Sequence, residues 1–112
     1  MILYENMIKG YKIITLCGST KFKDEFLKCQ EELTLKGCIV LSVGLFGHAD
    51  EKFKTVITDE VKEMLDDMHK RKIDLSDEIF VINKDGYIGS STKGEIEYAV
   101  SNGKTVKYLE NV

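Results

Sequence analysis

The stretch "KIITLCG", residues 12–18, decides the fold. It is a short apolar and β-branched run that stops at a glycine, which is the pattern of a buried strand. Three similar runs follow: "CIVLSVG" at residues 38–44, "EIFVIN" at 78–83 and "KTVKYLE" at 104–110. These runs are apolar rather than strictly alternating, and apolar strands are typical of a parallel sheet with helices on both faces.

Helical patterns separate the strands. Residues 19–37 carry apolar side chains at roughly helical spacing, with Ser19 or Thr20 as the expected N-cap and Gly37 as the expected stop. A second helix is expected from about residue 56 to residue 75, with Met64 and Met68 in its apolar stripe. A third, "EIEYAVSNG" at residues 95–103, is expected to follow a loop at residues 84–94.

The resulting order, β-α-β-α-β-α-β, predicts a three-layer α/β fold of the Rossmann-like or flavodoxin-like kind. We expect a mainly parallel sheet of four or five strands, with the order 2-1-3-4. The first ten residues are either an extra edge strand or a tail. With 112 residues, the chain is expected to form a single domain, residues 1–112. Ligands of such folds bind at the carboxyl ends of the strands.

Composition narrows the class of partner. A net charge of −3 provides no general field for nucleic acid or for an anionic membrane, and no apolar run approaches ~18 residues. The three cysteines form no CxxC pair and only two histidines are present, so we expect no metal and no cofactor. An odd number of unpaired cysteines suits a reducing compartment, which predicts a cytoplasmic protein.

The turn after the first strand, "CGSTKFK" at residues 17–23, has two interpretations. Gly18, Ser19 and Thr20 can offer N–H and hydroxyl donors to an anion, with Lys21 adding charge. The same residues can instead form a simple N-cap. The turn has neither the Walker A pattern nor GxGxxG.

A second candidate binding segment is "GYIGSSTKGEIEYA" at residues 86–99, which can be read either as a ligand-binding loop or as a helix cap. Gly89, Ser90, Ser91 and Thr92 could cradle a phosphate or sugar hydroxyls at a helix N-terminus. However, Thr92 to Glu95 also fits the S/T-x-x-E capping box, in which the glutamate only accepts a backbone N–H. The local pattern favours the cap. If Ser91 were the N-cap instead, Glu95 would be free to face a ligand.

Three further features have both a structural and a functional interpretation. His69 lies near an apolar stripe, where a single histidine is more often structural. Asp66 belongs to a run of acids that suits a solvated helix face. His48 lies in the loop after the second strand, where it could contact a base or sugar or simply be exposed.

Taken in order, three segments resemble the nucleoside 2-deoxyribosyltransferase superfamily, and within it the 2'-deoxynucleoside 5'-monophosphate N-hydrolases. The segments are "KIITLCGSTK" (12–21), "LSDEIFVIN" (75–83) and "GEIEYAVSNGKTV" (94–106). The resemblance implies cleavage or transfer at the N-glycosidic bond of a nucleoside or nucleoside monophosphate. It also implies a homodimer whose neighbour closes the site.

The resemblance also implies roles for particular residues. Glu95, four residues before Ala99, takes the place of the family's nucleophile in E-x-x-x-A. Gly18 and Ser19 are then sugar- or phosphate-binding, and Lys21 stands where relatives can have an arginine. Ser90, Ser91 and Thr92 fall in the phosphate-contacting loop. We expect a carboxylate in the first helical turn to be held ionised by the helix N-terminus.

One family residue is missing. Where relatives carry an aspartate on the helix before the third strand, this chain has His69, and Asp66 lies one turn earlier. Either of these side chains replaces the aspartate, or the reaction differs. Two alternatives therefore stay open: a non-catalytic nucleotide- or sugar-phosphate-binding module, and a glycohydrolase of the NAD type.

Overall fold

The computed structural model describes residues 10–47 and 57–112. The elements in these two ranges are β1 (Ile13–Gly18), α2 (Lys23–Leu35), β2 (Ile39–Leu41), α3 (Asp59–Leu75), β3 (Glu78–Ile82), the short 3-10 helix η2 (Lys84–Gly86), α4 (Ser90–Ser101) and β4 (Thr105–Tyr108). The strands form one sheet in the order β2-β1-β3-β4, with every pair parallel. The predicted order is confirmed.

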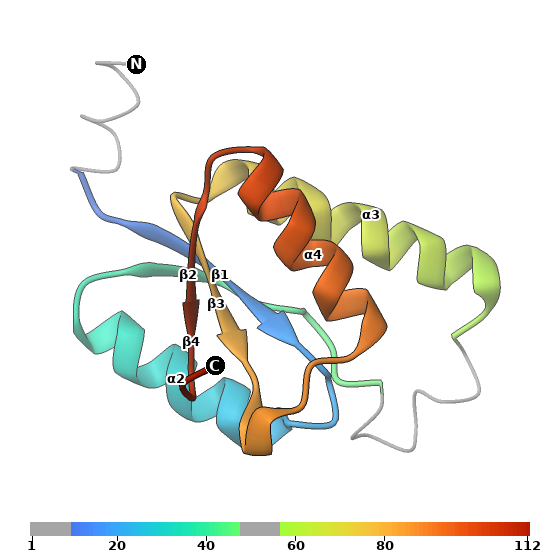
Figure 1. The fold of residues 1–112 in the computed structure, drawn as a ribbon, viewed down its shortest axis with the longest axis horizontal. Helices are drawn as coiled ribbons and strands as arrows, with labels where there is room; N and C mark the ends of the chain where they lie inside the picture. The colour runs from blue at the N-terminus through green and yellow to red at the C-terminus, as the bar shows by residue number, and fades with distance from the viewer. Residues whose placement is uncertain (1–9, 48–56) are drawn as a thin grey trace.

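Helices cover both faces of this sheet, as expected of a three-layer fold (Figure 1). Helix α2 lies on one face, and α3 and α4 lie together on the other. The possible fifth strand falls on residues 1–9, which lie outside the described residues. The sheet of the described chain therefore has four strands.

Two separate cores explain why the strands are apolar on both faces. Successive side chains of a strand point to opposite faces. Ile14 and Leu16 of β1 pack on the α2 side, in the cluster that contains Phe26, Cys29 and Ile82. Cys17 of β1 points the other way, into the cluster of Ile73, Ile79, Val81 and Ala99. Strands that bury both faces carry continuous apolar runs.

The start of α2 differs from the prediction. Its N-cap is Phe22, without a side-chain cap hydrogen bond, so neither Ser19 nor Thr20 caps the helix. The reason is a tight turn between β1 and α2, in which the Phe22 N–H donates to the Ser19 carbonyl at 3.1 Å. The predicted end is confirmed: Gly37 has a φ of 88°, and the N–H groups of Gly37 and Cys38 close a Schellman motif on the last turn.

Helix α4 begins five residues before its predicted start. Residues 90–94 were expected in a loop, but they form the first turn, with Gly89 as an extended N-cap. A glycine inside a helix costs only about 1 kcal/mol relative to alanine, and a Cβ placed at Gly94 meets no atom within 4 Å. Gly94 therefore does not stop the helix.

Helix α3 starts at Asp59, after the N-cap Thr58, whose hydroxyl accepts the Val61 N–H at 3.2 Å. The predicted stripe is wrong at two positions, since Met64 and Met68 are 51% and 43% exposed. The buried residues of α3 are His69 and Ile73. The N-terminal end of α3 reaches past the sheet in Figure 1.

Two polar ties fix the chain near the strand ends. The buried Asn83 side chain donates to the Glu110 carbonyl at 3.0 Å and accepts the Glu110 N–H at 2.8 Å. On the other side, Thr15 Oγ1 donates to the Lys72 carbonyl at 3.0 Å, and Lys72 Nζ donates to the Ser42 carbonyl at 2.6 Å. The second pair holds α3 against the ends of β1 and β2.

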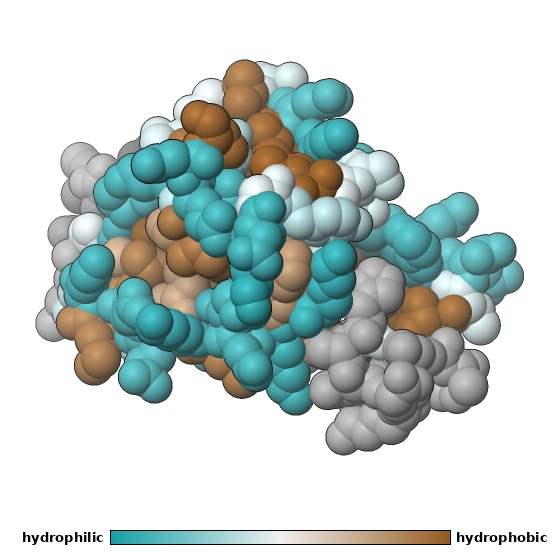
Figure 2. Space-filling view, turned by 60° about the horizontal axis from the view of Figure 1, so that its bottom comes forward, coloured by the Kyte–Doolittle hydropathy of each residue, from teal (hydrophilic) through white to brown (hydrophobic). Residues whose placement is uncertain are grey.

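The face in Figure 2 is mainly hydrophilic, with hydrophobic residues showing between the charged ones. None of the helices in residues 10–47 and 57–112 has the length and apolar content needed to cross a membrane. The three cysteines are all free, and Cys17 and Cys29 are buried.

Candidate active site

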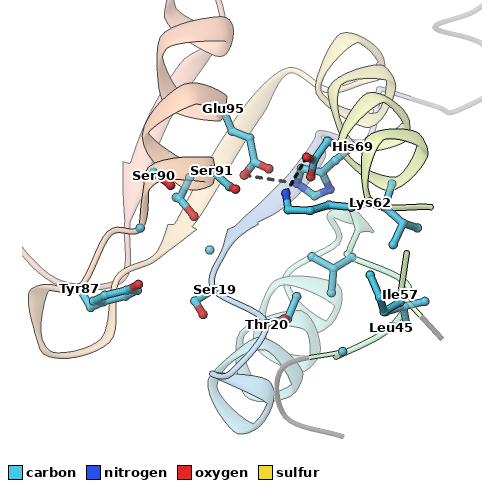
Figure 3. Close-up of a pocket in the computed structure, with 17 residues that line it drawn as sticks. Ser19, Thr20, Leu45, Ile57, Lys62, His69, Tyr87, Ser90, Ser91 and Glu95 are labelled. Carbon is cyan, nitrogen blue, oxygen red and sulfur yellow. Dashed lines mark hydrogen bonds and ion pairs between the residues drawn. The ribbon is translucent and has the colours of Figure 1, made fainter. Parts of the chain in front are cut away.

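A cavity of about 550 Å³ opens at the carboxyl ends of β1 and β3. This is where ligands of open parallel sheets bind. Ten of the residues singled out in the sequence line it: Gly18, Ser19, Thr20, Asp66, His69, Gly89, Ser90, Ser91, Thr92 and Glu95. Segments that are distant in the sequence therefore meet at one place, as Figure 3 shows.

Two predicted residues are not among those that line the cavity. The Lys21 ammonium lies over the ring of Tyr87, 3.7 Å from its centroid, and Lys21 is not among the lining residues. Its predicted contact with a ligand stays a prediction. His48 lies outside the described residues.

The sequence reasoning missed several lining residues. Three of them belong to segments that carry predicted site residues: Tyr87, Lys62 and Leu65. Four others lie before and after residues 48–56: Val43, Leu45, Gly47 and Ile57. The signal for Lys62 was its place four residues before Asp66, one helical turn away. Val43 and Leu45 carried no chemical signal, because apolar residues after a strand look the same in a core.

Small polar residues form one rim of the cavity. Ser90 and Ser91 project from the start of α4, across from Ser19 in the turn after β1 (Figure 3). The first N–H groups of a helix have no partner within the helix and carry partial positive charge. No acidic side chain occupies this first turn. The rim can therefore accept an anionic or hydroxyl-rich group.

Glu95 is not a capping residue. The N-cap is Gly89 rather than Thr92 or Ser91, so the capping-box interpretation is wrong. Glu95 lies in the second turn, where its carboxylate points toward His69 (Figure 3). The distance from Glu95 Oε1 to His69 Nε2 is 4.0 Å, and the Glu95 side chain is 15% exposed. It reaches the cavity while it stays largely desolvated.

The environment of Glu95 favours its protonated form. Burial raises the pKa of Glu95 to about 7, and the negative charge of Asp66 adds to this, while a hydrogen bond with Cys17 and the charges of Lys62 and Lys70 oppose it. The expectation of a firmly ionised carboxylate is wrong, because Glu95 is one turn too far along α4 to benefit from the helix N-terminus. Near neutral pH, the site contains both forms.

His69 is an uncharged base. Burial lowers the pKa of His69 to about 4, and the charge of Lys72 lowers it further, against interactions with the Leu16 backbone and Asp66. A neutral imidazole with so low a pKa is a poor proton donor to a leaving group. Its Nε2 lies 3.4 Å from Cys17 Sγ and 4.0 Å from Glu95 Oε1. His69 is thus placed to position Glu95.

Asp66 has a different environment on the same wall. It is exposed, and its Oδ2 lies 2.9 Å from Lys62 Nζ. Both residues line the cavity. Asp66 is thus both part of an exposed helix face and part of the cavity wall, as the two interpretations of the sequence required. Its carboxylate is available to a bound molecule.

Cys17 is fully buried beside His69 and is not among the residues that line the cavity. From the sequence it was expected only to be a small buried residue. Burial raises the pKa of the Cys17 thiol well above its usual value, and so does the neighbouring Glu95. The donor atoms of Cys17, His69 and Glu95 all lie within 4.8 Å of one another. Among the described residues, this is the group of histidine, cysteine and acidic side chains that could hold a metal ion.

Comparisons of this chain with protein-family models, with curated proteins and with solved structures find no match.

Proposed function

We propose that this protein cleaves or transfers the N-glycosidic bond of a nucleoside or nucleoside 5'-monophosphate, with Glu95 as the nucleophile. One observation carries the proposal: a largely buried carboxylate reaches a cavity that is also lined by hydroxyl and glycine residues from the turn after β1 and from the start of α4. The motif resemblance to the nucleoside 2-deoxyribosyltransferase superfamily supports the same chemistry. A cavity of about 550 Å³ falls within the usual range for small-molecule sites, about 300–1,000 Å³.

In the proposed reaction, the ionised Glu95 attacks the anomeric carbon of the sugar. A carbon–oxygen bond forms, the carbon–nitrogen bond breaks, and the base leaves with the electron pair and takes up a proton from water in the open cavity. Water, or a second base, then releases the sugar from Glu95. Desolvation makes the carboxylate more nucleophilic when it is ionised, and the same negative charge stabilises an oxocarbenium-like transition state.

The other residues take supporting roles. Ser19, Ser90 and Ser91, with the N–H groups of the first turn of α4, bind the sugar and any 5'-phosphate. His69 positions the Glu95 carboxyl, because its Nε2 lies 4.0 Å from Glu95 Oε1 and 3.4 Å from Cys17 Sγ. Asp66, held by Lys62, contacts the leaving base.

The test is release of free base from a panel of nucleosides and nucleoside 5'-monophosphates, with ribose and with deoxyribose, followed by chromatography. We expect Glu95→Gln to abolish release. Glu97→Gln is the matched control, since Glu97 is exposed and lies two residues along the same helix. Equal loss in both variants, or undiminished release in Glu95→Gln, would refute the assigned nucleophile.

The pH dependence sharpens this test. A nucleophile must be ionised, and the pKa of Glu95 is about 7. The rate of base release should therefore rise with pH across this value and then level off. A rate that falls across the same range would instead assign Glu95 as a proton donor.

A second candidate is a nucleotide- or sugar-phosphate-binding module without catalysis. The observation that favours it is the low charge of the floor, where His69 is neutral and Glu95 is partly protonated near pH 7. Calorimetric binding of a panel member with no release of base would support this candidate over the enzyme. We further propose a homodimer from the family resemblance, and light scattering of the purified protein tests it.

A further inference from the structure

We propose that Cys17, His69 and Glu95 form a binding site for a thiophilic divalent cation, for which Zn²⁺ is the best fit. The site uses one side chain from each of β1, α3 and α4, so the fold itself brings the three donors together. The geometry and chemistry of these three side chains do not depend on the proposed function.

The distances suit one ion. In tetrahedral zinc sites the ligand bonds are about 2.3 Å to sulfur and about 2.0–2.1 Å to nitrogen, which places two ligand atoms about 3.5 Å apart. Here Cys17 Sγ lies 3.4 Å from His69 Nε2, and His69 Nε2 lies 4.0 Å from Glu95 Oε1. All three donor atoms lie within 4.8 Å of one another. Small side-chain shifts are enough to place one ion in contact with all three.

The donor set selects the metal. A thiolate, an imidazole and a carboxylate together favour zinc over magnesium or calcium, which prefer oxygen ligands alone. Glu95 and His69 also line the cavity, so the fourth position of a tetrahedral ion would face bound water or a ligand. Three protein ligands and an open position form the arrangement of a reactive zinc site.

The surroundings hold the donors in place. Cys17 is fully buried and His69 is 7% exposed. The hydrogen bond from Thr15 Oγ1 to the Lys72 carbonyl, at 3.0 Å, fixes α3 against β1 next to these two donors. An ion entering from the cavity therefore finds the sulfur and the imidazole already oriented, and only Glu95 needs to adjust.

Binding changes the chemistry of the site. The Cys17 thiol and the Glu95 carboxyl each lose any proton that they hold when the ion binds. A carboxylate coordinated to zinc cannot attack a sugar, so zinc should inhibit base release; this consequence, unlike the site itself, rests on the proposed function.

The experiment measures metal binding without any nucleotide. Protein freed of metal with a chelator and kept reduced with a phosphine is titrated with Zn²⁺ against a chromophoric zinc indicator, and separately with Co²⁺. We expect one ion per chain and a thiolate-to-cobalt charge-transfer band. The variants Cys17→Ser, His69→Asn and Glu95→Gln should each weaken zinc affinity by at least about tenfold. Replacing a residue that only supports a metal ligand already lowers affinity by about 10- to 100-fold, and replacing the ligand itself should cost at least as much.

The chain offers matched controls in its two other cysteines. Cys29→Ala and Cys38→Ala should keep both the affinity and the charge-transfer band, and urea unfolding verifies that each variant is folded. If Cys17→Ser does not fold, Glu95→Gln and His69→Asn still decide the question.

Three outcomes would overturn the site: no stoichiometric binding, binding that survives all three ligand substitutions, or a charge-transfer band that depends on Cys29 or Cys38. The assay also separates the two proposals. Zinc binding with no base release from the metal-free protein leaves the site standing and removes the function. Base release without zinc binding supports the proposed function and rules out the zinc site.

Discussion

Replacing Glu95 by glutamine should make the stability of the protein much less sensitive to pH. Folding raises the pKa of Glu95 from 4.5 to about 7, chiefly through burial. The folded protein therefore binds a proton at Glu95 more tightly than the unfolded chain does. This contribution to stability is fully present below pH 4.5, and it is lost as the pH rises through about 7.

The magnitude follows from the size of the shift. One pKa unit corresponds to about 1.4 kcal/mol, so the shift of Glu95 represents about 3 kcal/mol between low and high pH. Most of this change falls between about pH 5 and about pH 8. Glutamine has nearly the same shape as the protonated side chain and does not ionise. As the pH rises across that interval, the free energy of unfolding of Glu95→Gln should increase by about 2–3 kcal/mol relative to that of wild type.

Urea unfolding of the metal-free protein at several pH values measures this difference directly. Wild type, Glu95→Gln and the control Glu97→Gln are compared, since Glu97 is exposed on the same helix. The curve of the control should run parallel to that of wild type. His69 adds its own pH dependence at lower pH, but all three proteins share it.

Parallel curves for wild type and Glu95→Gln would refute the reasoning. They would show that the Glu95 carboxyl is hydrated or paired with a cation in solution. The assignment of a desolvated carboxyl to the floor of the cavity would then be wrong.

Three further predictions concern the framework of the site, and urea unfolding checks each. Gly18→Ala should cost about 2 kcal/mol or more, since the φ of Gly18 is 151° and an added Cβ would lie 2.8 Å from the Ile82 carbonyl oxygen. Gly94→Ala should stabilise the protein by up to about 1 kcal/mol, because the added methyl group meets no atom and α4 gains helix propensity; destabilisation would show that α4 does not include Gly94. Asn83→Ala should cost about 2–3 kcal/mol by leaving the backbone of Glu110 without its two partners, whereas the exposed Asn111→Ala should change little.

The order and pairing of the strands could be predicted because they depend on features that a sequence displays. Residues 13–17 are mainly apolar and are buried on both faces of β1, and Gly37 and Gly103 mark the ends of the helices that they follow. Short crossover connections then leave few arrangements of the sheet. The meeting of Ser19, His69 and Glu95 follows from that arrangement alone.

The details of the site could not be predicted in the same way. The start of α4 was misplaced because Gly94 is a poor helix former, although packing outweighs a cost of that size. The raised pKa of Glu95 depends on desolvation, which only the packed structure defines. The contact of Cys17 with His69 joins residues 52 positions apart, and no local pattern indicates it.

The contact between Lys21 and Tyr87 has a consequence for any molecule with an aromatic ring. The ammonium of Lys21 already covers one face of the Tyr87 ring, at the edge of the cavity. A base that stacks on that face must displace the ammonium, which gives up about 0.5–2 kcal/mol of cation–π attraction. The displaced charge is then free to swing toward a phosphate. This contact would thus couple the binding of an aromatic base to the binding of an anion.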